Sequence, residues 1–259
     1  MRRFSLLMLL VLLAAAGEAR PARIVSMNPC TDAILVQVAD GRQIAGISHW
    51  SRDLAGTSIP LDVANRFPVQ FGSAEEVIAR DPDLVILSPH TPLATRAALA
   101  RLGVPMLKIG VPTSIAESVQ QVRSIASAAG YPERGERLAR QIETAAAKPA
   151  AKPAISALIR MGSGTVPGEN TLADELLRRA GFRNASPDYG LATWDMLPVE
   201  RLVANPPTLL LTDRPNGQHP VVARAHIRVE DFDGRLLNCG GPTIVPALAR
   251  LAEIRATMP

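Results

Sequence analysis

Two stretches of the chain share one pattern: Glu76-Val-Ile-Ala-Arg-Asp-Pro-Asp-Leu-Val-Ile-Leu87 and Glu200-Arg-Leu-Val-Ala-Asn-Pro-Pro-Thr-Leu-Leu-Leu211. In each, an acidic residue opens a segment with apolar residues at helical spacing, a proline ends the segment, and an apolar run follows. Such runs are typical of strands buried on both faces of a parallel sheet. The copies begin 124 positions apart, which indicates one domain plan used twice, with a cleft between two lobes as a natural place for a ligand.

Strands and helices alternate along the chain around the first copy. Apolar runs typical of strands cover 23–27, 43–48 and 105–109, and segments with helical spacing cover 30–39, 95–102 and 114–129. This alternation predicts an α/β fold in which each lobe is a mostly parallel sheet flanked by helices.

A charged segment marks the boundary between the lobes. Residues 132–147 carry arginines and glutamates spaced for pairing on a helix surface, and a Lys-Pro-Ala-Ala-Lys-Pro stretch at 148–153 ends the pattern. We predict an N-terminal α/β lobe at 20–130, a single long connecting helix with its linker at 131–153, and a C-terminal α/β lobe at 154–259.

The N-terminus has the pattern of a secretory signal peptide. Arg2 and Arg3 precede an apolar run at 6–16, and small residues follow with a cleavage position after Ala19. No cysteine stands at this position, since Cys30 lies beyond it. We expect residues 1–19 to be cleaved and the protein to be periplasmic and not lipid-anchored.

Composition and motifs argue against several classes of function. The formal net charge is +4, the basic residues are scattered and aromatic residues make up 3% of the chain, so no nucleic-acid partner is expected. The sequence contains neither Gly-x-Ser-x-Gly nor His-Glu-x-x-His. Its glycine-rich stretch at 162–168 lacks the Lys-Ser/Thr of a phosphate-binding loop. We therefore expect a protein that is not an enzyme.

Five segments occur in a characteristic order: Arg23-Ile-Val-Ser-Met-Asn-Pro29, the block 72–86, Leu102-Gly-Val-Pro-Met106, Thr171-Leu-Ala-Asp-Glu-Leu-Leu177 with Ala180-Gly181, and 197–211. Together they resemble periplasmic solute-binding proteins of the ferric-siderophore and cobalamin uptake type. The resemblance implies two α/β lobes joined by one long helix, a shallow cleft that changes little on binding, and delivery of the ligand to a membrane ABC importer.

The same resemblance implies how the protein meets the permease of that importer. One acidic residue on each lobe of these proteins docks onto permease arginines, and the matching positions are Glu75 or Glu76 and Glu200. Stabilisation of the helix N-termini by these carboxylates is the alternative, and both roles are compatible.

Candidate ligand contacts follow from a rule for open parallel sheets, in which ligands lie beyond the carboxyl ends of the strands. The candidates are Asn28, Pro29, Cys30, His49, Trp50, Arg52 and His90 in the first lobe and Arg160, Tyr189, Trp194 and Arg214 in the second. The aromatic residues favour a flat ligand that stacks, and the arginines could hold carboxylate or catecholate oxygens. Packing beneath a loop is the alternative for Tyr189 and Trp194.

The two cysteines leave three alternatives open. Cys30 and Cys239 could form a disulfide between the lobes, stay as separate thiols, or bind a metal or haem together with His49 and His90. The spacings match no local zinc motif, so we expect neither a resident metal nor a cofactor.

These observations predict a monomeric periplasmic protein that captures an iron complex, a haem-like ring or a corrinoid between its lobes and delivers it to an ABC importer. The iron or cobalt would belong to the ligand. A periplasmic sensor or scaffold on the same fold is the first alternative, and a secreted cleft hydrolase is the second.

Overall fold

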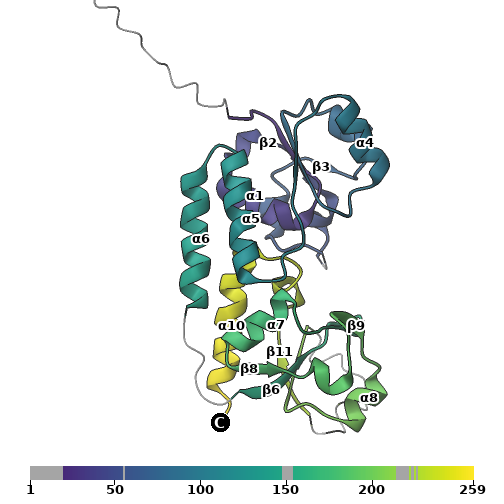
Figure 1. Ribbon diagram of the computed structural model, residues 1–259, viewed down its shortest axis with the longest axis vertical. Helices are drawn as coiled ribbons and strands as arrows, with labels where there is room; N and C mark the ends of the chain where they lie inside the picture. Colours follow the sequence, from purple (N-terminus) through teal and green to yellow (C-terminus); the bar gives the residue numbers. More distant parts are fainter. Residues whose placement is uncertain (1–19, 55, 148–153, 214–221, 223–224, 226) are drawn as a thin grey trace, which may run out of the picture.

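The computed structural model describes residues 20–259 except 55, 148–153, 214–221, 223–224 and 226. Two α/β lobes lie one above the other, and long helices run along one side of both (Figure 1). The predicted signal peptide and Arg214 lie outside the described residues. Within the described part of the chain, no helix is long and apolar enough to cross a membrane.

The N-terminal lobe is built on a parallel sheet of strand order β3-β2-β1-β4-β5. Its strands are β1 (Ile24–Ser26), β2 (Ile44–Ser48), β3 (Val69–Gln70), β4 (Leu84–Leu87) and β5 (Met106–Lys108). Its helices are α1 (Pro29–Val38), α2 (Leu61–Ala64), α3 (Ala74–Ile78) and α4 (Leu93–Arg101). Because the chain adds β2 on one side of β1 and β4 on the other, the loops after β1 and β4 diverge and leave a crevice at the carboxyl ends of the strands.

The C-terminal lobe repeats this plan with the parallel order β11-β10-β6-β8, which corresponds to β5-β4-β1-β2 of the first lobe. Its strands are β6 (Ile155–Ile159), β8 (Phe182–Asn184), β10 (Leu209–Thr212) and β11 (Arg228–Asp231), with an antiparallel pair β7 (Thr165–Pro167) and β9 (Trp194–Met196). Helices α7 (Leu172–Arg179) and α8 (Val199–Ala204) belong to this lobe. The duplicated domain plan inferred from the sequence repeat is therefore present in the strand order.

The structure corrects the register of that repeat by one residue. Helices α3 and α8 begin at Ala74 and Val199, and strands β4 and β10 begin at Leu84 and Leu209, so both pairs are 125 positions apart. The counterpart of Glu200 is therefore Glu75. Each of these glutamates is the second residue of a short helix that leads into a central strand of its sheet.

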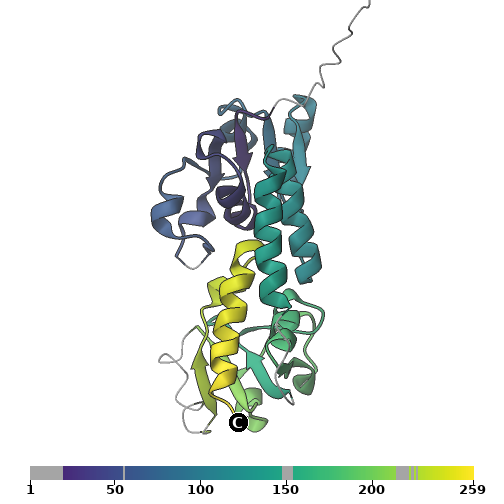
Figure 2. The same cartoon turned by 90° about the vertical axis from the view of Figure 1, so that its left-hand side faces the viewer.

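The predicted connecting helix is α6 (Pro132–Ala146), and α5 (Ile115–Ala128) and α10 (Ile244–Ala256) pack against it where the lobes meet. Helix α6 runs from the first lobe to the second beside α5, and α10 packs against α6 and α7 (Figures 1 and 2). Helices α5 and α6 approach closely at Gly135, where a Cβ atom would lie 2.4 Å from that of Ala126. One apolar core continues through both lobes, from Ile24 in β1 to Leu209 in β10.

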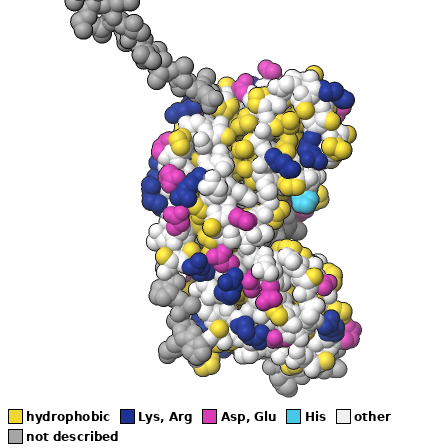
Figure 3. Space-filling view, in the orientation of Figure 1, with side chains coloured by type: hydrophobic (Ala, Val, Ile, Leu, Met, Phe, Trp, Pro, Cys, Tyr) yellow, Lys and Arg dark blue, Asp and Glu magenta, His cyan; other side chains and the backbone are white. Residues whose placement is uncertain are grey.

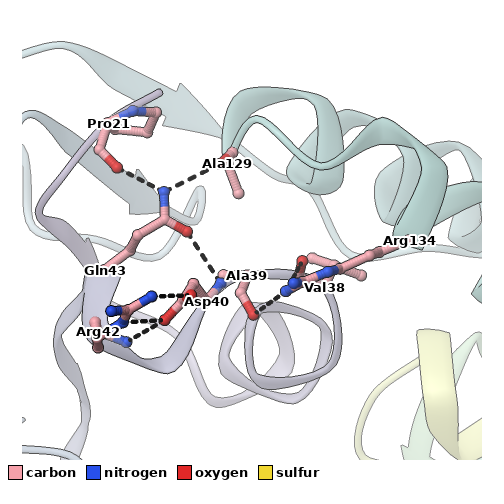
Figure 4. A network of polar contacts seen from close by, with 8 residues as sticks. All are labelled: Pro21, Val38, Ala39, Asp40, Arg42, Gln43, Ala129 and Arg134. Carbon is pink, nitrogen blue, oxygen red and sulfur yellow. Dashed lines mark hydrogen bonds and ion pairs between the residues drawn. The ribbon is translucent and has the colours of Figure 1, made fainter. Parts of the chain in front are cut away.

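A polar network fastens the outer end of α1 to the turn between α5 and α6 (Figure 4). The Gln43 amide donates to the carbonyls of Pro21 (2.6 Å) and Ala129 (3.2 Å). Arg134 of α6 donates to the carbonyls of Val38 (3.3 Å) and Ala39 (2.8 Å) at the end of α1. The Arg134 bonds satisfy carbonyls that α1 cannot pair internally, and the network as a whole fixes the first lobe to the connecting helices.

Candidate ligand-binding cleft

Two adjoining pockets lie at the carboxyl ends of the strands. The N-lobe pocket, of about 230 Å³, is lined by residues that follow β1, β2, β3 and β4. The interlobe pocket, of about 240 Å³, is lined by residues from both lobes. Asn28 and Ser88 belong to both linings, so the pockets form one cleft. It opens in the indentation between the lobes, opposite the connecting helices (Figure 3).

Three rings form an aromatic cluster in the N-lobe pocket. The His49 ring lies 4.7 Å from that of Trp50 and stacks on that of Phe71 at 4.8 Å between centroids. Trp50 and Phe71 are 52% and 67% exposed. Because large apolar side chains are normally buried, this exposed cluster makes the pocket a candidate binding surface. Sequence reasoning missed Phe71, because β3 has only two residues and leaves no periodic pattern.

A buried carboxylate holds the turn that carries this cluster. Asp32 of α1 is fully buried and accepts hydrogen bonds from the Ser48 amide (2.9 Å) and the Ser51 hydroxyl (2.6 Å). Ser48 in turn caps the His49–Arg52 turn by accepting from the Trp50 amide (3.3 Å). Burial raises the pKa of Asp32 to about 7, against the lowering effect of its hydrogen bonds.

The residues after β1 shape the cleft through the start of α1. Asn28 is the N-cap of this helix, where its side chain accepts from the Cys30 amide (2.8 Å), and Pro29 occupies the first turn. Both choices are typical of helix starts. Asn28 and Pro29 therefore combine a structural role with their position in the pocket lining.

The C-terminal lobe contributes Trp194 and Met161 to the interlobe pocket. Trp194 begins β9, pairs with Pro167 of β7 and is 50% exposed. Met161 follows β6, the strand equivalent to β1. The cleft thus has an aromatic residue on each side, Trp50 from one lobe and Trp194 from the other.

Cys30 and Cys239 are joined by a disulfide. Of the three alternatives for the cysteines, which were a disulfide, separate thiols and metal or haem ligands, the first is present. The Cα atoms of Cys30 and Cys239 are 5.0 Å apart, and both residues line the interlobe pocket. No cysteine of the chain is free, which removes thiolates as metal ligands. Among the described residues, no group of three or more His, Cys, Asp or Glu side chains could hold a metal ion.

Three predicted contacts have other roles in the structure. Arg52 donates to the Phe67 carbonyl (2.6 Å), and Arg160, whose pKa is lowered by burial, donates to the Leu197 carbonyl (3.3 Å). Neither arginine lines the two pockets. Tyr189 is 4% exposed in the core of the C-terminal lobe, where its hydroxyl donates to the Asn205 carbonyl. Tyr189 therefore packs inside the lobe, as in the alternative given for it, and does not line either pocket. His90, by contrast, lines the N-lobe pocket.

The three glutamates assigned to docking differ in their surroundings. Glu76 accepts a hydrogen bond from the Phe71 amide (2.9 Å) and so closes the start of α3. Glu75 and Glu200 are exposed at equivalent positions of α3 and α8. All three lie in the first turn of a helix, where a carboxylate is favourable, and Glu76 also holds the Phe71 amide.

Comparisons with known proteins agree on one family. The family model described as "Periplasmic binding protein" matches residues 24–223. A cobalamin-binding protein of Halobacterium salinarum is 26% identical over 205 residues, which cover 75% of this chain and 54% of that relative. The chain therefore spans about half the length of that curated relative.

Two further comparisons cover most of both chains. An uncharacterized ABC transporter substrate-binding lipoprotein of Bacillus subtilis, YvrC, is 24% identical over 257 residues, or 90% of this chain and 79% of the relative. The solved apo form of the periplasmic heme-binding protein RhuT of Roseiflexus sp. RS-1 matches with a TM-score of 0.71 and 25% identity, covering 90% of this chain and 98% of that one.

Proposed function

The chain belongs to the family of periplasmic binding proteins, and from that premise we propose that it captures a ring-shaped metal chelate in its interlobe cleft and delivers it to an ABC importer. Its family and structural neighbours are binding proteins and not enzymes. The proposed ligand is a haem, a corrinoid or an iron chelate, since relatives and structural neighbours are named for cobalamin, haem or iron binding.

The observation that carries the proposal is the pair of half-exposed tryptophans, Trp50 and Trp194, on opposite lobes of one cleft. An indole presents a large flat apolar face at low entropic cost. Two such faces bordering a cleft suit a ligand that is itself flat and exposes a ring.

The cleft is preformed in this proposal. The disulfide and the continuous core join the lobes at its floor, so binding would require little rearrangement. A preorganised site loses less conformational entropy on binding than one that has to close.

For the partner, we propose that Glu75 and Glu200 dock onto basic groups of the permease, one from each lobe. Their equivalent, exposed positions suit a permease with two similar halves. We also propose that residues 1–19 direct the protein to the periplasm and are removed there without lipid attachment, although the Bacillus relative is named a lipoprotein.

Tryptophan fluorescence tests the proposal. The purified protein is titrated with haemin, cyanocobalamin and ferric siderophores, with correction for their absorbance. Saturable quenching by one of them at micromolar or lower Kd is expected. No saturable response to any of them would contradict the function.

Substitution of the tryptophans identifies the site. Trp50→Ala and Trp194→Ala should each weaken binding about two- to tenfold, because a stacking contact contributes about 0.5–1.5 kcal/mol. Their unfolding midpoints should stay close to that of the wild type, since both side chains are half exposed. Leu102→Ala removes another exposed apolar side chain, outside the cleft lining, and should leave the Kd unchanged. Wild-type affinity in both tryptophan variants would remove them from the site.

A further inference from the structure

The polar groups of the described cleft lining share the lack of a fixed charge. They are amides, hydroxyls and imidazoles, and the lining residues that the structure describes include no lysine, arginine, aspartate or glutamate. The amide-bearing residues of the two pockets are Asn28, Gln70, Asn170 and Asn238. Amides and hydroxyls pair well with other neutral polar groups. A carboxylate buried among them would lose its hydration without gaining a cation.

Two arginines predicted as ligand contacts lie in the described part of the chain, and both donate hydrogen bonds within the protein. Arg52 and Arg160 donate to backbone carbonyls, and Asp32 is buried beneath the His49–Arg52 turn. Moving Arg160 toward a ligand would leave the half-buried Leu197 carbonyl without this donor.

Gln70 points to the kind of group that the ligand supplies. This residue ends β3, is 2% exposed and lines the N-lobe pocket together with Trp50 and His90. Its Nε2 donates to the Ser26 carbonyl (3.0 Å), whereas its Oε1 is buried without a hydrogen-bond partner. Buried acceptors are normally paired. A small shift of this amide toward the pocket would pair Oε1 with a ligand that brings a donor, such as an amide N–H.

We infer that the cleft selects a corrinoid-type ligand, a flat ring whose edge carries neutral amides, over rings and chelates whose edges carry carboxylates or catecholates. This inference rests on the proposed function, because it names the ligand class of the same site. The ring faces contact Trp50 and Trp194, and the edge amides exchange hydrogen bonds with Gln70 and the asparagines. Porphyrin propionates and the catecholate oxygens of siderophores are acceptors that carry negative charge.

A pair of ligands with the same metal and ring tests the inference directly. Dicyanocobinamide carries amides around the corrin, and dicyanocobyrinic acid carries carboxylates. Isothermal titration calorimetry at neutral pH should give a Kd for the amide ring at least tenfold lower than that for the carboxylate ring, and lower than that for haemin. Equal or tighter binding of the carboxylate ring or of haemin would overturn the inference and leave the proposed function intact. Binding of none of the three, nor of a ferric siderophore, would overturn both.

A variant at Gln70 assigns the selection to this residue. Gln70→Leu should raise the Kd for the amide ring about tenfold while changing that for the carboxylate ring much less, so that the ratio of the two constants falls. Gln43→Leu is the matched control, because Gln43 is also buried but lies in the network beside α5 and α6 (Figure 4). Thermal melting verifies that both variants are folded. An unchanged ratio in Gln70→Leu would contradict the role of Gln70.

Discussion

At the scale of single residues, Asp32 links stability to pH. Its carboxyl stays protonated in the folded protein up to about pH 7, whereas an unfolded aspartate ionises near its ordinary pKa of 3.8. Between these values the unfolded state binds fewer protons than the folded state. Stability therefore falls as the pH rises through this interval. The hydrogen bonds that Asp32 accepts from Ser48 and Ser51 hold its carboxyl in the buried position, although the burial lowers stability at higher pH.

We predict that the free energy of unfolding decreases by about 1.4 kcal/mol per pH unit between about pH 4 and pH 7 through this one group. Asp32→Asn should remove that slope, because its amide does not ionise. Urea unfolding of the wild type and the variant at several pH values measures the difference. Asp62→Asn, at an exposed aspartate, is the control and should keep the wild-type slope. A slope in Asp32→Asn equal to that of the wild type would show that Asp32 is already ionised when folded.

Residues also show the limits of sequence reasoning about the site. The rule that ligands lie beyond the strand ends led to Trp50, His90 and Trp194, which line the pockets. It cannot tell which way a side chain turns after a strand. Tyr189 turns inward to an apolar core and a carbonyl, and Arg52 turns to the backbone of Phe67. Such choices depend on partners distant in the sequence.

At the scale of helices and strands, the duplicated unit of a short helix followed by a central strand was visible in the sequence, but its register was not. The second copy has two adjacent prolines, Pro206 and Pro207, where the first has Pro82 alone. Matching Pro82 with Pro206 shifts the comparison by one residue. The observed starts of α3 and α8 match Glu75 with Glu200.

This register leads to a prediction about docking. Glu75→Arg combined with Glu200→Arg should leave ligand affinity unchanged but reduce importer-dependent uptake at least tenfold, because two attractive contacts become repulsive. Uptake of labelled ligand by cells carrying the matching importer measures the effect.

Two controls separate docking from helix stability. Glu133→Arg reverses a charge at the same position of α6, in its first turn, and should lower stability similarly without reducing uptake. Glu76→Gln keeps an acceptor for the Phe71 amide and should also transport normally. Normal uptake by the double variant would exclude docking through these residues.

At the scale of the whole molecule, α5, α6 and α10 and the Cys30–Cys239 bond join two repeats into one body. The two-lobed α/β fold could be predicted, because alternating apolar and helical segments determine it locally. The joint could be predicted only in part: the Cys30–Cys239 bond was one of three alternatives for the cysteines, whereas the packing of residues 239–244 on α1 depends on contacts between segments far apart in the sequence. A Cβ on Gly241, whose φ is +65°, would lie 2.7 Å from Cγ1 of Ile34. Glycine is thus required at this junction.

The disulfide should stabilise the molecule strongly. It closes a loop of 209 residues, and restricting so long a loop in the unfolded chain contributes about 2–5 kcal/mol. Cys30→Ser combined with Cys239→Ser should lower the free energy of urea unfolding by this amount. Adding a reducing agent should lower stability in the wild type and leave the variant unchanged. A variant as stable as the oxidised wild type would contradict this role.

The return of residues 239–244 to α1 also couples the folding of the first lobe to that of the second. The first lobe lacks part of its apolar covering until nearly all of the chain has been made, so the N-terminal half cannot complete its packing alone. The two lobes should consequently form in a single cooperative step, although multidomain chains commonly fold one domain after another. Differential scanning calorimetry is expected to show one transition whose calorimetric and van't Hoff enthalpies agree, and two separable transitions would show independent folding.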